Sequence, residues 1–146
     1  LYVHRPSITD PTVAPDGDDT FYALSPVPHL GHDNGVDWDE MAEPYRQKVQ
    51  KVLEEQMMPG LADRITASEV FTPLTFRDRY LSPLGAGFSF EPRMFQSAWF
   101  RPHNVSEEVK GLYLVGAGTH PGAGVPSVVT SAEVLAKLVP DAETVR

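Results

Sequence analysis

The sequence predicts an α+β fold in which short strands and a few helices alternate with long connections. An apolar run at 112–115 enters a glycine-rich loop that leads into a segment with helical periodicity. Residues 37–56 carry the clearest amphipathic pattern, and apolar runs of strand length occur elsewhere. Fourteen prolines in 146 residues favour short elements joined by fixed turns over a regular helical bundle.

Composition narrows the class of protein. The chain is 41% hydrophobic and 22% charged, which is ordinary for a globular domain with one core. The absence of cysteine excludes disulfides and thiol catalysis, and a net charge of −8 argues against a nucleic-acid partner. No apolar run approaches the ~20 residues of a spanning helix. We expect a cytoplasmic protein, with peripheral membrane association left open. Leu1 is not an initiator, which suggests a cut within a longer chain.

The first elements are two short strands. Residues 1–4 form one candidate and residues 20–27 the next, with a loop of proline, glycine and aspartate at 8–19 between them. Together they predict an antiparallel pair. Pro26 and Pro28 are expected to end the pairing of the second strand.

A helix follows, with Asp37 as its predicted N-cap. Because proline breaks a helix interior, Pro44 predicts a short turn up to Glu43 and a main helix from Pro44 to about Gln56. The charged opposite face is typical of a solvated surface. Pro59-Gly60 is expected to close the element.

The middle of the chain predicts smaller elements. Residues 65–71 have strand composition, and Thr72-Pro73 is typical of the start of a short helix. The charged triplet at 77–79 is expected to be a solvated turn or a local ion pair. Residues 84–94 lack clean periodicity and are expected to be irregular, and 140–146 to be a frayed polar tail.

The stretch at 111–136 organises the chain. Its apolar run at 112–115 predicts a strand buried on both faces, and Pro126 fits the first turn of the helix after the glycine loop. This arrangement aims free N–H groups and the positive end of a helix dipole at an electron-rich ligand. The alternative is a tight loop that only lets strand and helix pack. Gly116-Ala117-Gly118 lacks the third glycine of a dinucleotide fingerprint.

Two strings carry a resemblance to a known family. They are Gly-Leu-Tyr-Leu-Val-Gly-Ala-Gly-Thr-His-Pro-Gly-Ala-Gly-Val-Pro at 111–126 and Gln-Ser-Ala-Trp-Phe-Arg-Pro-His-Asn at 96–104. Both resemble the C-terminal signature of the bacterial-type phytoene desaturases, which are FAD-dependent carotenoid desaturases of the amine-oxidase-like superfamily. The likeness extends upstream to Pro26 and covers nearly the whole chain.

The resemblance implies an organisation and an activity. Family members are longer and begin with a Gly-x-Gly-x-x-Gly motif that this sequence lacks, so the resemblance implies a C-terminal portion. Residues 1–103 would belong to the substrate-binding domain, with a sheet and helices. Residues 104–146 would form the C-terminal strand, loop and helix of the FAD-binding domain. The implied function is the introduction of double bonds into phytoene in carotenoid biosynthesis.

The implied cofactor is FAD in the complete enzyme, and we do not expect this chain alone to bind it. Related flavoproteins often have an acidic residue at the position of Ala117, so we expect contacts from backbone instead. The predicted cofactor-binding residues are Gly116, Ala117, Gly118, Val125, Pro126, Ser127 and Val128. The implied partners are phytoene or a related polyene and the N-terminal FAD-binding portion, with a homo-oligomer left open.

An aromatic cluster is the candidate polyene-binding wall. The predicted substrate-binding residues are Phe88, Trp99, Phe100 and Arg101. Buried core aromatics are the alternative for the group at 99–101. If the first interpretation holds, Phe88, Phe90, Trp99 and Phe100 should be partly uncovered in this chain.

No catalytic residue is assigned. His29 and His32 are three residues apart but have no third ligand, so we expect surface histidines and no metal. His120 is expected to face a ligand or cap the helix, and no Ser-His-Asp arrangement is evident. Whether this chain is itself an enzyme is left open. The alternative is a non-catalytic module that self-associates or complements a separate N-terminal FAD-binding chain.

Overall fold

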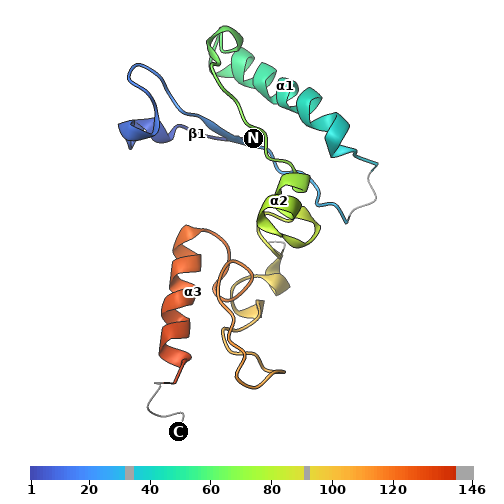
Figure 1. The fold of residues 1–146 in the computed structure, drawn as a ribbon, viewed down its shortest axis with the longest axis vertical. Coiled ribbons are helices and arrows are strands. Elements are labelled where there is room, and N and C mark those ends of the chain that lie inside the picture. The colour runs from blue at the N-terminus through green and yellow to red at the C-terminus, as the bar shows by residue number, and fades with distance from the viewer. Residues whose placement is uncertain (32–34, 91–92, 141–146) are drawn as a thin grey trace.

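The computed structural model describes residues 1–31, 35–90 and 93–140 (Figure 1). Its elements in chain order are β1 (Tyr2–His4), β2 (Tyr22–Leu24), α1 (Trp38–Gln56), α2 (Pro73–Tyr80) and α3 (Val125–Leu138). The β-hairpin and α1 lie at one end of a drawn-out molecule, α2 lies in the middle and α3 at the other end (Figure 1). The mixture of helices with a small sheet confirms the α+β class at this coarse level.

The sheet of the described residues is the hairpin alone. β1 and β2 are antiparallel with Tyr2 opposite Leu24 and His4 opposite Tyr22, as predicted, although β2 is shorter than 20–27. The connection between the strands is closed by a bidentate pair from the Arg5 guanidinium to the Asp19 carboxylate, at 2.8 and 2.7 Å. This ion pair places the two strand ends side by side.

α1 begins as predicted and then continues where a break was expected. The Asp37 carboxylate accepts hydrogen bonds from the N–H groups of Asp39 and Glu40 and thus caps the helix. The prediction of an interruption at Pro44 is wrong, because α1 is one helix of 19 residues with Pro44 inside it. A proline in a helix interior costs about 3 kcal/mol. Contacts that span the proline oppose this cost: the rings of Trp38 and Tyr45 meet edge to face at 6.2 Å.

Single hydrogen bonds join these elements. The hydroxyls of Ser25, just after β2, and Tyr45 of α1 lie 2.7 Å apart. The Leu30 N–H donates to the Leu84 carbonyl at 2.9 Å and connects the loop before α1 to the turn after α2. Few contacts therefore fix the hairpin, α1 and α2 relative to one another.

α2 is a short helix packed tightly on the turn that follows it. Thr72 and Thr75 form a capping box, which confirms the predicted start. Gly85 has a φ of +67°, and a Cβ there would lie 2.1 Å from the Pro73 carbonyl oxygen, so only glycine fits. Residues 65–71, predicted as a strand, form no regular strand, since no described segment pairs with them.

In the glycine-rich region the predicted helix is confirmed and the predicted buried strand is wrong. α3 carries Pro126 in its first turn, as predicted. Residues 112–115 do not form a doubly buried strand: Tyr113 makes one isolated bridge to Val105, and Leu112 and Val115 are exposed. A buried strand needs neighbours on both edges and layers on both faces, whereas the described residues supply one edge partner. Pro140 is exposed, and the rest of the tail lies outside the described residues, as does His32.

The molecule exposes much more surface than its mass requires. Its accessible surface is 11261 Å², against about 7,400 Å² for a compact monomer of this size. Of the large hydrophobic side chains in the described ranges, Trp38 and Leu53 alone are buried. None of the described helices is both long and apolar enough to cross a bilayer.

The Glu43–Arg46 ion pair in α1 predicts that the stability of the chain depends on pH. Hydrogen bonds from Arg46 and then Gln47 lower the pKa of the Glu43 carboxyl from 4.5 to about 2. A lowered folded-state pKa contributes stability that is present above pH 4.5 and is lost as pH falls toward 2. We expect the melting-temperature difference between the full chain and its Glu43→Gln variant to shrink over this window, followed by circular dichroism. Glu55→Gln on the same helix is the control, and a difference independent of pH would contradict the assignment.

Candidate functional site

The predicted cofactor loop is held in place by buried polar side chains. Among the described residues, five polar or charged residues are buried, and four of them surround this loop. We refer to these four as the polar cluster: Arg101, Asn104, Thr119 and Ser131. They come from the segment before the loop, from the loop itself and from the middle of α3. The cluster therefore joins three stretches of chain that are distant in sequence.

Asn104 is the centre of the polar cluster and is 3% exposed. Its side-chain amide lies 3.1 Å from the Leu114 carbonyl, 3.4 Å from the Ser131 carbonyl and 3.5 Å from the Thr119 hydroxyl. The backbone carbonyl of Asn104 accepts a hydrogen bond of 2.9 Å from the Leu114 N–H. One side chain thus ties the apolar run before the loop to the helix after it.

Gly116 begins the loop, and both of its backbone polar groups are bonded within the protein. The Gly116 N–H donates to the fully buried hydroxyl of Ser131 at 2.8 Å. The Gly116 carbonyl accepts from the hydroxyl and the N–H of Thr119, at 2.9 and 3.2 Å. A φ of +113° makes glycine necessary at this position.

Arg101 supports the loop from the other side. Its side chain is buried, and its guanidinium donates to the carbonyls of Ala117 and Phe90, the latter at 3.2 Å. The loop passes the same side chain again at Gly122, where a Cβ would lie 3.4 Å from the Arg101 Nε. The structure thus places this residue, predicted to bind substrate, against backbone.

The remaining predicted cofactor residues lie at the start of α3. Val125 and Pro126 are exposed, and Ser127 and Val128 are half-buried. No described side chain caps this end, and Val128 is the first residue to donate within the helix, to the Gly124 carbonyl. The N–H groups of Val125 and Ser127 are left as donors at the positive end of the dipole. This donor set fits an electron-rich edge such as that of a flavin.

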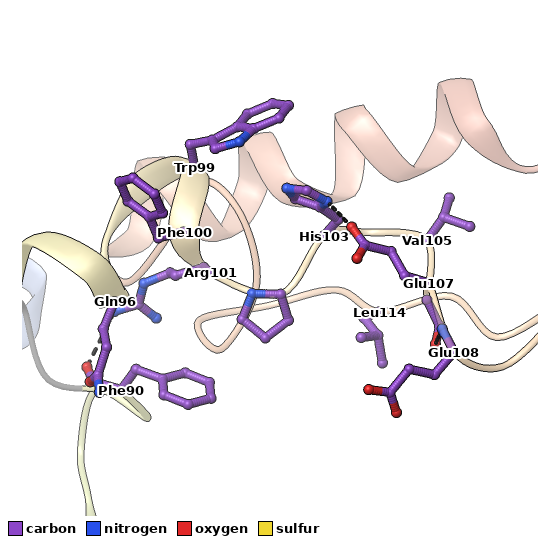
Figure 2. Close-up of a pocket in the computed structure, with 12 residues that line it drawn as sticks. Phe90, Gln96, Trp99, Phe100, Arg101, His103, Val105, Glu107, Glu108 and Leu114 are labelled. Atoms are coloured by element: carbon purple, nitrogen blue, oxygen red, sulfur yellow. Dashed lines mark hydrogen bonds and ion pairs between the residues drawn. The ribbon is translucent and has the colours of Figure 1, made fainter.

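The aromatic residues before the loop form one wall of an open pocket of about 660 Å³ (Figure 2). Trp99 and Phe100 line it and are 67% and 57% exposed, so they are not core residues. Phe88 is also exposed but lies outside the lining. Phe90, which does line it, is 42% exposed. The expectation that these aromatics are partly uncovered is confirmed.

The histidines of this region bond to the protein. The His103 Nδ1 lies 2.7 Å from the Glu107 carboxylate, and Figure 2 marks this contact with a dashed line. The Trp99 ring lies 4.8 Å from the His103 ring. The His120 Nδ1 donates to the Ala98 carbonyl at 3.1 Å, so His120 anchors the loop instead of capping α3. Within the described ranges, no three His, Asp or Glu side chains are grouped so as to hold a metal.

No motif in the sequence predicts a role for Asn104, Thr119 or Ser131. Ser131 is the one whose position in the hydrophobic pattern of α3 could have identified it. Ser131 lies three residues after Val128 and four before Leu135, so the helical spacing places it on the apolar face of α3. A polar residue on such a face needs a buried partner. The partner, a backbone N–H of a loop, has no sequence signature.

Comparisons with known proteins give a consistent result. The chain is 74% identical over 142 residues to a phytoene desaturase (neurosporene-forming) of Rhodobacter capsulatus, and 73% identical over 146 residues to one of Cereibacter sphaeroides. It is 50% identical over 139 residues to a phytoene desaturase (lycopene-forming) of Pseudescherichia vulneris. These matches cover 95–100% of the chain, which spans about 28% of the length of these relatives. No family model matches it.

The polar cluster predicts the effect of an isosteric change. Asn104→Asp replaces a donor by an acceptor that faces the carbonyls of Leu114 and Ser131. We expect the free energy of unfolding of the full chain to fall by about 2–4 kcal/mol in urea titrations at neutral pH. The loss should diminish at low pH, where a protonated carboxyl donates again. Gln96→Glu makes the same chemical change at an exposed position, and equal stability of the two variants would exclude this role of Asn104.

Proposed function

Because the chain is homologous over its whole length to bacterial phytoene desaturases, we propose that it supplies one wall of the flavin site and one wall of the polyene site of such an enzyme. The enzyme would introduce double bonds into phytoene or a related polyene in carotenoid biosynthesis. The observation that carries the proposal is the identity of 73–74% to two neurosporene-forming desaturases. The corresponding division at residue 103, with a substrate-binding part before it, stays a prediction.

The start of α3 and the loop before it support the flavin wall. The proposed contacts come from Gly116, Ala117, Gly118, Val125, Pro126, Ser127 and Val128. When bound, FAD supplies the two-electron oxidation that removal of hydride from carbon requires. The residues of this chain would bind and orient the cofactor. Backbone N–H groups and the dipole of α3 favour electron density at the edge they face.

The exposed aromatics support the polyene wall. Phe88, Trp99 and Phe100 present apolar rings to the exterior, and Arg101 lines the same pocket as Trp99 and Phe100. A hydrocarbon chain offers no hydrogen-bonding groups, so an apolar aromatic surface is the complement that it needs. We propose that these residues contact the polyene once the site is complete.

A chimera tests the function of this chain directly. The homologous segment of the Rhodobacter capsulatus relative is replaced by this chain, and the purified product is assayed for bound flavin and for neurosporene formed from phytoene. We expect both to be retained. A folded chimera without flavin would overturn the proposal, and one with flavin but no desaturation would overturn the polyene wall.

Gly118→Val in the chimera separates a cofactor loop from a packing loop. A Cβ at Gly118 would lie 2.9 Å from the Ser89 hydroxyl, so stability could fall for packing reasons alone. Ser89→Gly removes that obstacle. We expect Gly118→Val combined with Ser89→Gly to regain thermal stability while flavin per folded protein stays low. Lys137→Ala, at the far end of α3, should change neither quantity. Full occupancy in the double variant would remove Gly118 from the flavin site.

The large exposed surface is also compatible with a second, non-catalytic function. A non-catalytic module that self-associates, or that complements a separate N-terminal FAD-binding chain, would also cover the apolar side chains. Under the main proposal the 146-residue chain alone holds too few contacts to retain FAD. We expect it to purify without stoichiometric flavin absorbance at about 450 nm and to be inactive on phytoene. Co-purified flavin would contradict this, and a monomer in sedimentation that binds no hydrophobic dye would exclude self-association.

A further inference from the structure

Arg101 is an unusual residue in this molecule because it is a charged side chain that is 6% exposed. Arginine is seldom buried unless its charge and its donors are used. The acceptors that the structure gives it are the backbone carbonyls of Ala117 and Phe90. Its guanidinium therefore donates to backbone on both sides, and one of these two acceptors, the Ala117 carbonyl, belongs to the loop.

The bond to the Ala117 carbonyl sets the direction of the next N–H. The His120–Pro121 bond is the one cis peptide of the described chain, so the unit between Ala117 and Gly118 is trans. In a trans peptide the carbonyl and the N–H point in opposite directions. Since the carbonyl points at the guanidinium, the Gly118 N–H points away from Arg101.

The orientation of the preceding peptide unit, between Gly116 and Ala117, is fixed in the same way. Thr119 holds the Gly116 carbonyl with its N–H and its hydroxyl, so the Ala117 N–H points away from Thr119. No described residue accepts a hydrogen bond from the Ala117 or the Gly118 N–H. Residues 117 and 118 are the central residues of the turn closed by the Thr119 N–H and the Gly116 carbonyl, and successive N–H groups in a turn form a concave site that suits an electron-rich oxygen.

We propose that Arg101 is a positioning residue that orients and polarises the 117–118 peptide so that the Ala117 and Gly118 N–H groups donate to an oxygen of the bound flavin. This inference rests on the proposed function. A cation on the carbonyl draws electron density through the amide and makes its N–H a stronger donor. The positive charge of Arg101 thereby acts on the cofactor across one peptide unit, without contact between them.

The test measures FAD affinity in the chimera described above. The flavin is removed, FAD is added back, and binding is followed by flavin fluorescence and visible circular dichroism. Loss of a charge-assisted bond should weaken binding about 10- to 100-fold in Arg101→Gln. Arg101→Lys, which keeps the charge but not the fork, should lie in between. Millimolar guanidinium should partly restore binding to Arg101→Gln. Arg79→Gln, an exposed arginine on α2, is the matched control.

The outcomes separate the two proposals. If the folded Arg101 variants bind FAD as the parent does, or lose only thermal stability, the positioning role is wrong and the proposed function stands. If guanidinium stabilises Arg101→Gln without improving FAD affinity, the residue is structural only, and the inference is again wrong. If the parent chimera itself binds no flavin, the proposed function fails, and the positioning role fails with it.

Discussion

The hydrogen bonds of the Asn104 amide are the interaction on which the functional half of this molecule depends. One side chain joins the approach to the loop, the loop and the helix after it, through Leu114, Thr119 and Ser131. A buried hydrogen bond contributes only about 1 kcal/mol net, but a buried polar group without a partner costs about 1–3 kcal/mol. The polar cluster therefore adds modest stability and excludes alternative arrangements. A single fixed arrangement suits a loop in which backbone N–H groups, and not side chains, are the proposed hydrogen-bond donors to the cofactor.

Elsewhere the molecule leaves apolar surface uncovered. The accessible surface of 11261 Å² exceeds that of a compact monomer of this mass by about 3,800 Å². Obligate interfaces bury about 2,000–5,000 Å² counted over both partners, so this excess is larger than one partner usually contributes to such an interface. Phe88, Trp99 and Phe100 are part of it, and so are Val125 and Val129 on the outer side of α3. Packing within the chain thus leaves uncovered an area that a compact monomer of this mass would bury.

Local signals in the sequence predicted the local structure well. The hairpin, the caps at Asp37 and Thr72 and the start of α3 each depend on a few neighbouring residues, and each is present. The errors concern residues whose structure depends on distant partners. The apolar runs at 112–115 and 65–71 have strand composition, but a strand also needs a neighbour, which composition cannot reveal. The break predicted at Pro44 rests on an intrinsic preference of proline, which contacts along α1 override. In the site, the glycine loop was evident, whereas the polar cluster was not.

The bond from Gly116 to Ser131 also restricts how this stretch of sequence can change in length. Ser131 lies in the second turn of α3, and one residue corresponds to about 100° of rotation about a helix axis. Removing a residue between Val125 and Ser131 would turn the hydroxyl away from the Gly116 N–H, although every side chain in the helix kept its chemical type. Removing one after Ser131 would leave that bond unaltered and would shorten only the far end of the helix. The stretch from the loop to Ser131 therefore tolerates substitution on its outer side but has a fixed length.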